Sequence, residues 1–494
     1  MPIHYFRNTV PLLAGIISSC LLAAQPSPAQ PDDLTPKDYL SKEFHASRRA
    51  ALRELLPDNS VMVVFAYPTR TFSNDVEYLY HQNPDMYYFT GYKEPHSVFL
   101  IFKNEQADSA GNRFQELLFV QKRNAAAEQW TGKRLGTEGV KEKLGISTVY
   151  NGEDFKKLGL DFSKFDKVIF DRFPVDIPNN PRDNADLFDL IQQFRQKAGV
   201  PDEYAKEKRF DTKAYRDLTA QLREIKTGEE LVLLRKAIEI SCQGQNEVMK
   251  AVRPDMSELE IQGLHEYVHK KYGAEEVGYG SIIGAGENGC ILHYMENTKT
   301  KVGTSMLLMD VGAEYHGYTA DVTRTIPVDG KFSAEEKAIY QLVYDAQEAA
   351  FQLLKNGCKW ADINNAARKT ITAGLVKLGV AKTEEEANQY YPHGLGHHIG
   401  LDVHDRGTYG ELKKDMVITI EPGIYIPEGS KCDKKWWSIA VRIEDDALIT
   451  ETGYELLSAF APRKIEEIEK MIAQKSAVDD FKLPPLKSAE KKGF

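Results

Sequence analysis

The sequence predicts two structural domains: an α/β domain in the first half of the chain and a domain of mixed helices and strands in the second. Three observations lead to this prediction. With 494 residues, the chain is too long for one ordinary hydrophobic core. Short runs rich in Val, Ile and Phe alternate with helical patterns in the first half. In the second half, strand-like runs contain carboxylates, and a cluster of histidines lies close to these runs.

The α/β domain is expected over residues 31–216. Four apolar runs bounded by Pro, Asn, Asp or Gly predict strands of a buried sheet. They are VMVVFAY (61–67), SVFLIF (97–102), ELLFV (116–120) and KVIF (167–170). The segments RRAALRELL (48–56) and DLFDLIQQFRQKAG (186–199) place apolar residues at helical spacing. We therefore expect helices between the strands.

The second domain is expected over residues 217–475. It follows a charged stretch without strand signals at 201–217 and opens with a long amphipathic helix at 228–252, which a Thr-Gly pair precedes. A charged tail is expected over residues 476–494.

Residues 1–29 have the pattern of a secretory signal. A basic residue precedes an apolar run over residues 10–24, and the segment QPSPAQP follows. The run is too short to span a membrane comfortably, and no later segment is apolar for long enough. The mature protein is expected to be secreted or periplasmic after cleavage near Ala24 or Ala29. Cys20 lies in a loose match to a lipoprotein cleavage box, so a lipid anchor is the alternative.

The composition excludes several classes of protein. Hydrophobic residues make up 42% and charged residues 28%, as in a soluble globular protein rather than a fibre or a disordered chain. The formal net charge of -10 is spread over segments of mixed sign, which gives nucleic-acid binding little support. The cysteines after the signal lack CxxC spacing, so we expect no disulfide framework. Each is expected to be buried as a small hydrophobic residue. They are Cys242, Cys290, Cys358 and Cys432.

The segment HEYVH presents one possible metal site. It matches the zincin pattern, in which His265 and His269 would hold zinc and Glu266 would activate water. So short a pattern also arises by chance and requires a third ligand. The apolar stripe of this helix is expected at Leu259, Leu264 and Val268. The histidines would then lie beside the stripe on a polar or half-buried flank, and we expect no zinc there.

A second possible metal site begins with two aspartates in SMLLMDVGAEYHGYTADVTRTIPV (305–328). A Gly-containing connection joins two strand-like runs, so Asp310 and Asp321 can meet across a hairpin. A carboxylate at the end of an apolar strand is costly to desolvate, and facing carboxylates repel each other. A metal ion between them removes both penalties. The alternative is a surface hairpin with two solvated aspartates.

Histidines cluster among glycines in YPHGLGHHIGLDVHD (391–405). Glycine allows close approach to a site, and histidine can ligate metal, transfer a proton or hydrogen-bond an oxyanion. The cluster consists of His393, His397, His398 and His404. We expect His398 to be a structural neighbour rather than a functional group.

Two glutamates interrupt apolar strand-like runs further on. Glu421 ends the run in MVITIEPGIYI, and Glu444 lies inside the run in SIAVRIEDDALIT. A buried glutamate in a strand is rare without a partner, which favours a ligand role. Together with Asp310, Asp321 and His397 they form an oxygen-rich set that can neutralise two divalent cations. This set suits manganese, iron, cobalt or zinc, and the lack of thiolates argues against a closed structural zinc site.

The motifs DVGAEYHGYTADVTRT, HGLGHHIGLDVHD, EPGIY and RIEDD present their ligands in the order Asp, Asp, His, Glu, Glu. In this order they resemble the pita-bread dimetal peptidases over residues 220–470. The stretch NPDMYYFTGYKEPHSVFLIF (83–102) resembles the N-terminal domain of the aminopeptidase P branch, which methionine aminopeptidases lack. Creatinase-like relatives keep the fold without the ligands. The resemblance implies an α/β N-terminal domain followed by an α+β pita-bread catalytic domain.

The resemblance also assigns the metal ligands. Asp310 would chelate one ion, His397 and Glu421 the other, and Asp321 and Glu444 would bridge both. A hydroxide held between the ions would be the nucleophile.

Five further residues receive catalytic roles from the same resemblance. His293, in ILHYMEN, and His404 would hydrogen-bond the scissile carbonyl or its oxyanion. His393 would help position the substrate. Arg442 and Tyr425 would orient the first aspartate of the ligand set.

The implied activity is that of a metal-dependent aminopeptidase that hydrolyses an N-terminal Xaa-Pro bond. Two divalent metal ions per chain are expected, Mn2+ first and Zn2+, Co2+ or Fe2+ as alternatives. The expected partners are peptides with proline second and further copies of the chain in a dimer or tetramer. Prolidase, an Xaa-Pro dipeptidase with the same ligands, is the nearest alternative. A non-catalytic peptide-binding protein on the same fold is disfavoured because all five ligands are intact.

Two stretches depart from the family pattern. Tyr87, in DMYYFTG, stands where some aminopeptidases P have Trp, and it could still form a wall in a neighbouring subunit's site. Trp436 and Trp437, in CDKKWWS between the last two ligands, could shape the pocket.

Overall fold

The computed structural model describes residues 36, 38–108, 111–480 and 483–484. The predicted secretion signal with Cys20 and the last ten residues of the predicted tail lie outside the described residues. Residues from Leu40 onward form one unit. In the described part of the chain, no helix has the length and apolar character needed to cross a bilayer.

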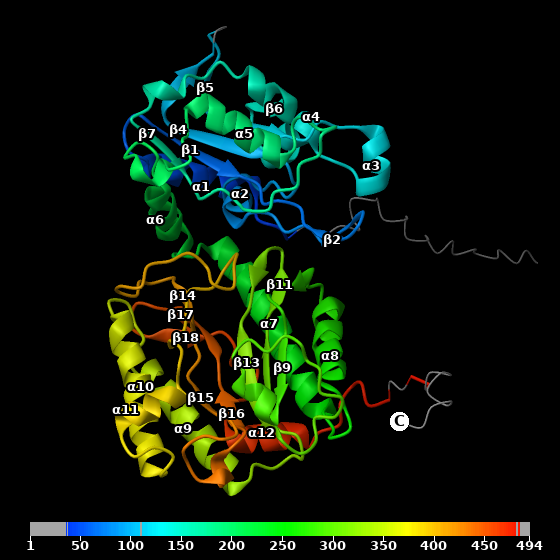
Figure 1. Cartoon of the computed structure of the whole chain (residues 1–494), viewed down its shortest axis with the longest axis vertical. Coiled ribbons are helices and arrows are strands. Elements are labelled where there is room, and N and C mark those ends of the chain that lie inside the picture. The colour runs from blue at the N-terminus through cyan, green and yellow to red at the C-terminus, as the bar shows by residue number, and fades with distance from the viewer. Residues whose placement is uncertain (1–35, 37, 109–110, 481–482, 485–494) are drawn as a thin grey trace, which may run out of the picture. The chain divides into compact units, whose positions relative to one another are not determined.

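The first domain is built on a mixed five-stranded sheet in the order β6-β5-β4-β1-β7 (Figure 1). β1 pairs antiparallel to β4 and parallel to β7. The parallel pairing requires a long crossover connection between β1 and β7. The strands are β1 (Ser60–Phe65), β2 (Thr71–Ser73), β3 (Val76–Glu77), β4 (Val98–Ala107), β5 (Arg113–Val120), β6 (Val149–Asn151) and β7 (Lys167–Phe170). The helices are α1 (Lys42–Leu55), α2 (Pro84–Thr90), α3 (Ala125–Thr131), α4 (Gly136–Leu144), α5 (Leu187–Ala198) and α6 (Thr212–Arg223).

Local signals explain these elements. The Asp186 side chain accepts a hydrogen bond from the Asp189 amide at the start of α5, a cap that contributes about 1 kcal/mol. The Phe194 ring of this helix packs edge to face on Phe65 and Phe170 of the sheet, which buries its apolar side. The four strands expected in this half are confirmed as β1, β4, β5 and β7, and the two helices as α1 and α5. α6 was not expected, and it runs across the anticipated domain boundary at residue 216.

The second domain combines small antiparallel sheets with long helices. Its strands are β8 (Glu276–Val277), β9 (Ile282–Ala285), β10 (Met306–Val311), β11 (Ala313–Tyr315), β12 (Tyr318–Thr319), β13 (Val322–Pro327), β14 (Val417–Ile420), β15 (Gly423–Ile426), β16 (Ile439–Arg442), β17 (Asp445–Ile449) and β18 (Tyr454–Leu456). Its helices are α7 (Gly228–Ala251), α8 (Glu258–Lys271), α9 (Ala334–Phe351), α10 (Trp360–Lys377), α11 (Glu384–Ala387) and α12 (Ile465–Ile472).

Three of the sheets position the site. They have the strand orders β13-β10-β9, β14-β17-β18 and β15-β16. Helices α7 and α8 lie on one flank of these strands and α9 and α10 on the other (Figure 1). The expected long helix is confirmed as α7, whose start is closed by a reciprocal capping pair between Thr227 and Glu230.

The run SIAVRIEDDALIT does not form one strand as expected. β16 pairs with β15, whereas β17 pairs with β14 in another sheet. The chain changes sheets at Ile443 and Glu444, and the Glu444 amide there donates to the Thr323 carbonyl. The glutamate thus lies at a break between sheets, where its side chain is free to face a cavity.

The expectation for helix α8 was wrong in one respect. His265 and His269 are not on a polar flank but are 0% and 1% exposed, whereas Leu259 is 60% exposed. The buried stripe is Glu258, Ile261, His265, Val268 and His269, so the histidines occupy core positions at helical spacing. All four of their ring nitrogens lack a hydrogen-bond partner within the described structure. Burial lowers the pKa of His269 to about 4, so the ring is neutral.

Candidate metal centre

All five predicted metal ligands line one cavity of about 390 Å³ in the second domain. Each comes from the end of a strand or from a turn beside one. Asp310 lies in β10, Asp321 directly precedes β13, Glu421 directly follows β14, and Glu444 lies between β16 and β17. His397 directly precedes His398, which forms an isolated antiparallel bridge with Ile418 of β14. Sequence positions far apart along the chain therefore meet at a single centre.

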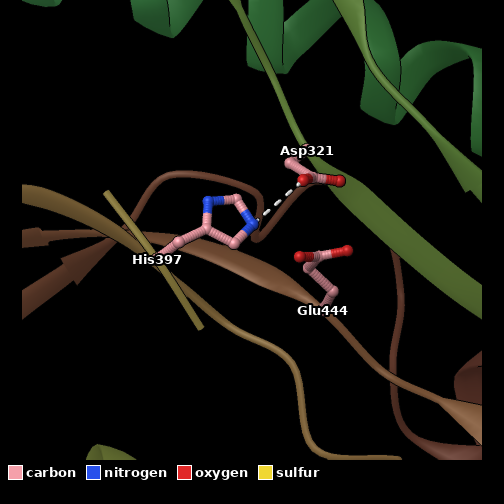
Figure 2. Close-up of side chains that lie close together, drawn as sticks. All are labelled: Asp321, His397 and Glu444. Carbon is pink, nitrogen blue, oxygen red and sulfur yellow. Dashed lines mark ion pairs between the residues drawn. The ribbon is translucent and has the colours of Figure 1, made fainter. Parts of the chain in front are cut away.

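Three of the ligands present atoms to a common point, as Figure 2 shows for Asp321, His397 and Glu444. One ligand atom from each lies within 4.8 Å of the others. The His397 Nε2 atom lies 3.4 Å from an Asp321 oxygen and 3.4 Å from a Glu421 oxygen. Asp321 and Glu444 are 5% and 1% exposed. A carboxylate pair flanking one imidazole at this spacing can hold a divalent cation.

Glycine places His397 against β14. A side-chain carbon on Gly396 would lie 2.0 Å from the Thr419 carbonyl oxygen, so no other residue permits this approach. The His397 amide donates to the Thr419 hydroxyl, and the Thr419 amide donates to the His397 carbonyl, at 3.1 and 2.9 Å. The Glu421 amide donates to the Leu395 carbonyl. These bonds set His397 and Glu421 side by side.

The electrostatics of the cluster favour a positive charge among its carboxylates. Burial raises the pKa of Glu421 to about 8, and burial together with the carboxylates of Asp321 and Glu421 raises the pKa of Glu444 well above its ordinary value. Burial also raises the pKa of Asp310, although Arg442 opposes the rise. Such acids hold protons where a cation would otherwise neutralise them. The donor set therefore fits divalent metal ions.

His397 and Asp321 form the ionised pair of the cluster. Burial alone would lower the pKa of His397, but Asp321 and Glu421 raise it to about 9. Burial alone would raise the pKa of Asp321, but the contact with His397 holds it below its ordinary value. The two neighbouring carboxylates thus favour a positive charge at His397, and they would favour a bound cation for the same reason.

A chain of hydrogen bonds supports Asp310. Arg442 donates to an Asp310 oxygen at 2.5 Å and to the Tyr425 hydroxyl at 2.8 Å. The Tyr425 hydroxyl lies 2.9 Å from His393 Nε2, and His393 Nδ1 lies 2.8 Å from the Gly394 carbonyl. Arg442 contacts Asp310 directly, whereas Tyr425 reaches Asp310 only through Arg442 and does not line the cavity.

The remaining histidines differ in how they are held. His293 and His404 line the cavity and are exposed, so their nitrogens can reach a ligand. The His404 ring packs edge to face on His397 with the ring centres 4.4 Å apart. Both nitrogens of His393 are engaged, and burial lowers its pKa to about 4. His398 is fully buried, contacts the Thr408 carbonyl and does not line the cavity, as expected of a structural neighbour.

Two residues that contact the ligands were missed. The Tyr279 hydroxyl lies 2.6 and 2.5 Å from oxygens of Asp310 and Asp321, and the Thr323 hydroxyl donates to Glu444 at 2.6 Å. Thr323 could have been found because it lies two residues after Asp321 and shares its strand face. Nothing local distinguishes Tyr279, which lies between glycines outside the ligand motifs.

Other expectations fall outside the site. Trp436 is 5% exposed and belongs to the hydrophobic core with Trp437 packed beside it, and neither lines the cavity, so they do not shape the pocket. Tyr87 is buried and does not line its own chain's cavity. The cysteines at 242, 290, 358 and 432 are free, but only Cys242 is buried. The other three are partly exposed, so the expectation of burial was wrong for them.

Comparison with protein families accounts for both halves of the chain. Residues 45–167 match the model of the aminopeptidase P N-terminal domain. Residues 232–451 match the model of metallopeptidase family M24. The predicted pairing of an α/β domain with a pita-bread catalytic domain is thereby confirmed.

Individual relatives match over nearly their whole length. The chain is 34% identical to an Xaa-Pro aminopeptidase of Escherichia coli over 450 residues, which covers 88% of this chain and 98% of the relative. Human Xaa-Pro aminopeptidase 3 is 30% identical over 478 residues, with 92% and 91% covered. A zinc-substituted E. coli aminopeptidase P with bound product superposes with a TM-score of 0.77 at 33% identity, covering 88% and 98%. The chain belongs to the Xaa-Pro aminopeptidase family of M24 metallopeptidases.

Proposed function

We propose that this chain is a metal-dependent aminopeptidase that removes an N-terminal residue preceding proline. The observation that supports the proposal most strongly is the convergence of Asp310, Asp321, His397, Glu421 and Glu444 on one cavity in a chain of this family. When bound, two divalent cations would supply Lewis acidity and an activated water at neutral pH.

The residues of the chain prepare this site for peptide hydrolysis. Arg442 and Thr323 fix the orientation of Asp310 and Glu444, as groups behind metal ligands generally do. His293, in the loop between β9 and β10, and His404, in the segment before β14, line the same cavity. Each can offer an N–H group to the oxygen of a scissile carbonyl. Partial burial against the cavity wall and the nearby His397 lower the pKa of His404, which favours the neutral ring with one donor and one acceptor.

We keep for His393 the expected role of positioning the substrate, without a hydrogen bond to it. Its Nδ1–H faces the Gly394 carbonyl, which leaves Nε2 as the acceptor for the Tyr425 hydroxyl. The ring is therefore fixed, with no free N–H for a carbonyl oxygen. We propose that His393 forms a wall that positions the substrate rather than a hydrogen-bond donor to it.

The proposed metal is manganese. An oxygen-rich set with one imidazole and no thiolate suits Mn2+, and zinc, cobalt and iron are accommodated by the same donors. Activity and metal occupancy measured after reconstitution with each ion would rank them.

The prolidase alternative is not favoured, because the relatives reported above are named aminopeptidases. The test compares three peptides with the manganese-loaded protein: an Xaa-Pro-Yaa tripeptide, the matched Xaa-Ala-Yaa tripeptide and an Xaa-Pro dipeptide. We expect release of Xaa from the first at a much higher kcat/KM than from the other two. A preference for the dipeptide would indicate prolidase, and no cleavage of any peptide would support a binding protein.

We propose that the mature chain is exported, because residues 1–29 have the pattern of a secretory signal. Cell fractionation of the full chain beside a Cys20→Ala variant would test this. A soluble exported product from both chains supports the proposal. Membrane association of the unaltered chain alone would indicate lipidation.

We propose that the chain assembles with further copies of itself. The strand pair β2 and β3 and the residues that follow it expose an apolar patch, since Phe72, Val76, Tyr78 and Leu79 are 63%, 54%, 58% and 74% exposed. Patches of this kind are typical of association surfaces. The molar mass measured by light scattering would distinguish monomer, dimer and tetramer.

A further inference from the structure

One buried carboxylate holds the loop that carries His293 at points before and after that residue. This carboxylate belongs to Glu258, the first residue of α8, which is 0% exposed. The loop joins β9 to β10 and includes the 3₁₀ turn Gly286–Cys290. At the start of the loop the Ala285 amide donates to Glu258 Oε1 at 2.9 Å. Beyond His293 the Lys299 amide donates to Glu258 Oε2 at 2.8 Å.

Two side chains from the middle of the loop complete the set of donors. Asn288 donates to Glu258 Oε1 at 3.0 Å, and the Tyr294 hydroxyl donates to Oε2 at 2.9 Å. The Glu258 amide in turn donates to the Lys299 carbonyl at 3.0 Å. Asn288 also reaches Oε2 at 3.3 Å, so Oε1 accepts two hydrogen bonds and Oε2 accepts three.

The anchor requires a side chain with two acceptor oxygens. All four groups that face Glu258 are donors, and an ionised carboxylate accepts at both oxygens whereas an amide accepts at only one. The first turn of a helix favours negative charge, because unpaired amides and the helix dipole point toward it. Ser257 already caps the Glu260 amide at this helix start, so the Glu258 side chain is free to serve the loop.

Tyr294 links this anchor to the cavity. Its ring is 5% exposed and its hydroxyl is held by Glu258, while the neighbouring His293 is exposed and lines the cavity. The contact between Tyr294 and Glu258 therefore fixes the backbone next to His293. Asn297 adds a second attachment by accepting from the Ile283 amide and donating to the Ser281 carbonyl, both at 3.0 Å.

We propose that Glu258 is a positioning residue for the reaction, holding the loop so that His293 faces the scissile carbonyl. The inference rests on the proposed function, in which His293 donates to that carbonyl. A displacement of about 1 Å of such a group can cost about a hundredfold in rate. Glu258 touches no substrate and acts only through the loop.

The test uses Glu258→Gln, which keeps the shape of the side chain but replaces one acceptor oxygen by a donor that opposes the loop amides. Tyr294→Phe keeps Glu258 and removes the Tyr294 hydroxyl, which donates to Glu258 and accepts from Asn288 and the Thr298 amide, and it serves if the first variant folds poorly. The matched control is Glu260→Gln, in the same helical turn with an exposed carboxylate. Each is measured for kcat, KM, metal content and amide hydrogen exchange, alone and combined with His293→Ala.

We expect Glu258→Gln and Tyr294→Phe to lower kcat by up to about a hundredfold with little change in KM or metal content. The loop amides should exchange faster. In the His293→Ala background neither change should lower kcat further, because the group they position is absent. Glu260→Gln should match the parent protein throughout.

Two results would overturn the proposal: an equal loss of kcat from Glu258→Gln in the His293→Ala background, or loop amides that exchange as in the parent. If the parent protein cleaves no Xaa-Pro peptide, the proposed function fails separately. In that case faster exchange of the loop amides in Glu258→Gln still supports the anchor, and unchanged exchange refutes it.

Discussion

The hydroxyl of Thr323 offers a sharp test of how the protein supports its metal ligands. It is fully buried, donates to Glu444 at 2.6 Å and accepts from Arg442 at 3.3 Å. Thr323→Val keeps the shape of the side chain and removes both bonds. Hydrogen bonds to charged groups contribute about 1.5–3 kcal/mol, and groups behind metal ligands affect affinity or activity by about 10- to 100-fold. We expect a loss of this size in metal affinity or in kcat/KM.

The assay is a metal titration followed by peptide cleavage at saturating metal. Thr325→Val is the matched control, since Thr325 lies two residues along the same strand and is equally buried. Its hydroxyl donates to the Arg442 carbonyl at 2.9 Å and accepts from the Arg442 amide at 3.1 Å, so it contacts no metal ligand. The control should cost about 1 kcal/mol of folding free energy and leave the metal titration unchanged. If Thr323→Val binds metal and turns over like the parent protein, or if both variants lose equally, Thr323 does not orient Glu444.

Other changes test the remaining parts of the site. Asp321→Ala or Glu444→Ala should abolish cleavage and lower the metal content measured by elemental analysis, because each removes a shared ligand from a buried cluster; full turnover in either variant contradicts the assignment. Removal of metal with a chelator should abolish activity and lower Tm, since a ligand that binds only the folded state stabilises it; unchanged Tm and activity contradict it. Because the pKa of Glu421 is about 8 and that of His397 about 9 without metal, metal binding at pH 7 should release protons. Affinity should therefore rise from pH 6 to pH 8, and calorimetry in buffers of different ionisation enthalpy would detect the release; an affinity independent of pH argues against it. His265→Leu should leave metal content and kcat unchanged and should not lower Tm, because it removes buried ring nitrogens that have no partner; a loss of metal would instead support the zincin alternative.

The fold could be predicted where burial leaves a periodic trace. The strands at 61–67 and 97–102 and the helix at 228–252 are apolar at the spacing of their element, and all three are present. α6 was missed although its buried Tyr215, Leu218 and Leu222 have helical spacing, because the charged sequence that leads into it at 201–213 suggested a linker.

The metal ligands could be predicted because carboxylates in apolar strands conflict with the pattern around them. Asp310 and Glu421 are conspicuous for that reason. Glu258 gives no such conflict, since a glutamate after a serine is typical of any helix start. Its burial depends on a distant loop, which the sequence pattern does not reveal. The same limit explains His265 and His269, whose polar chemistry suggested a flank although their spacing fits the core.

The most direct test of the account is an anomalous diffraction measurement on crystals of the manganese-loaded protein. We expect two peaks per chain within the cavity, both in contact with Asp321 and Glu444, one of them also with Asp310 and the other with His397 and Glu421. A single peak, a peak between His265 and His269, or no peak at these carboxylates would contradict the dimetal centre on which the proposed function depends.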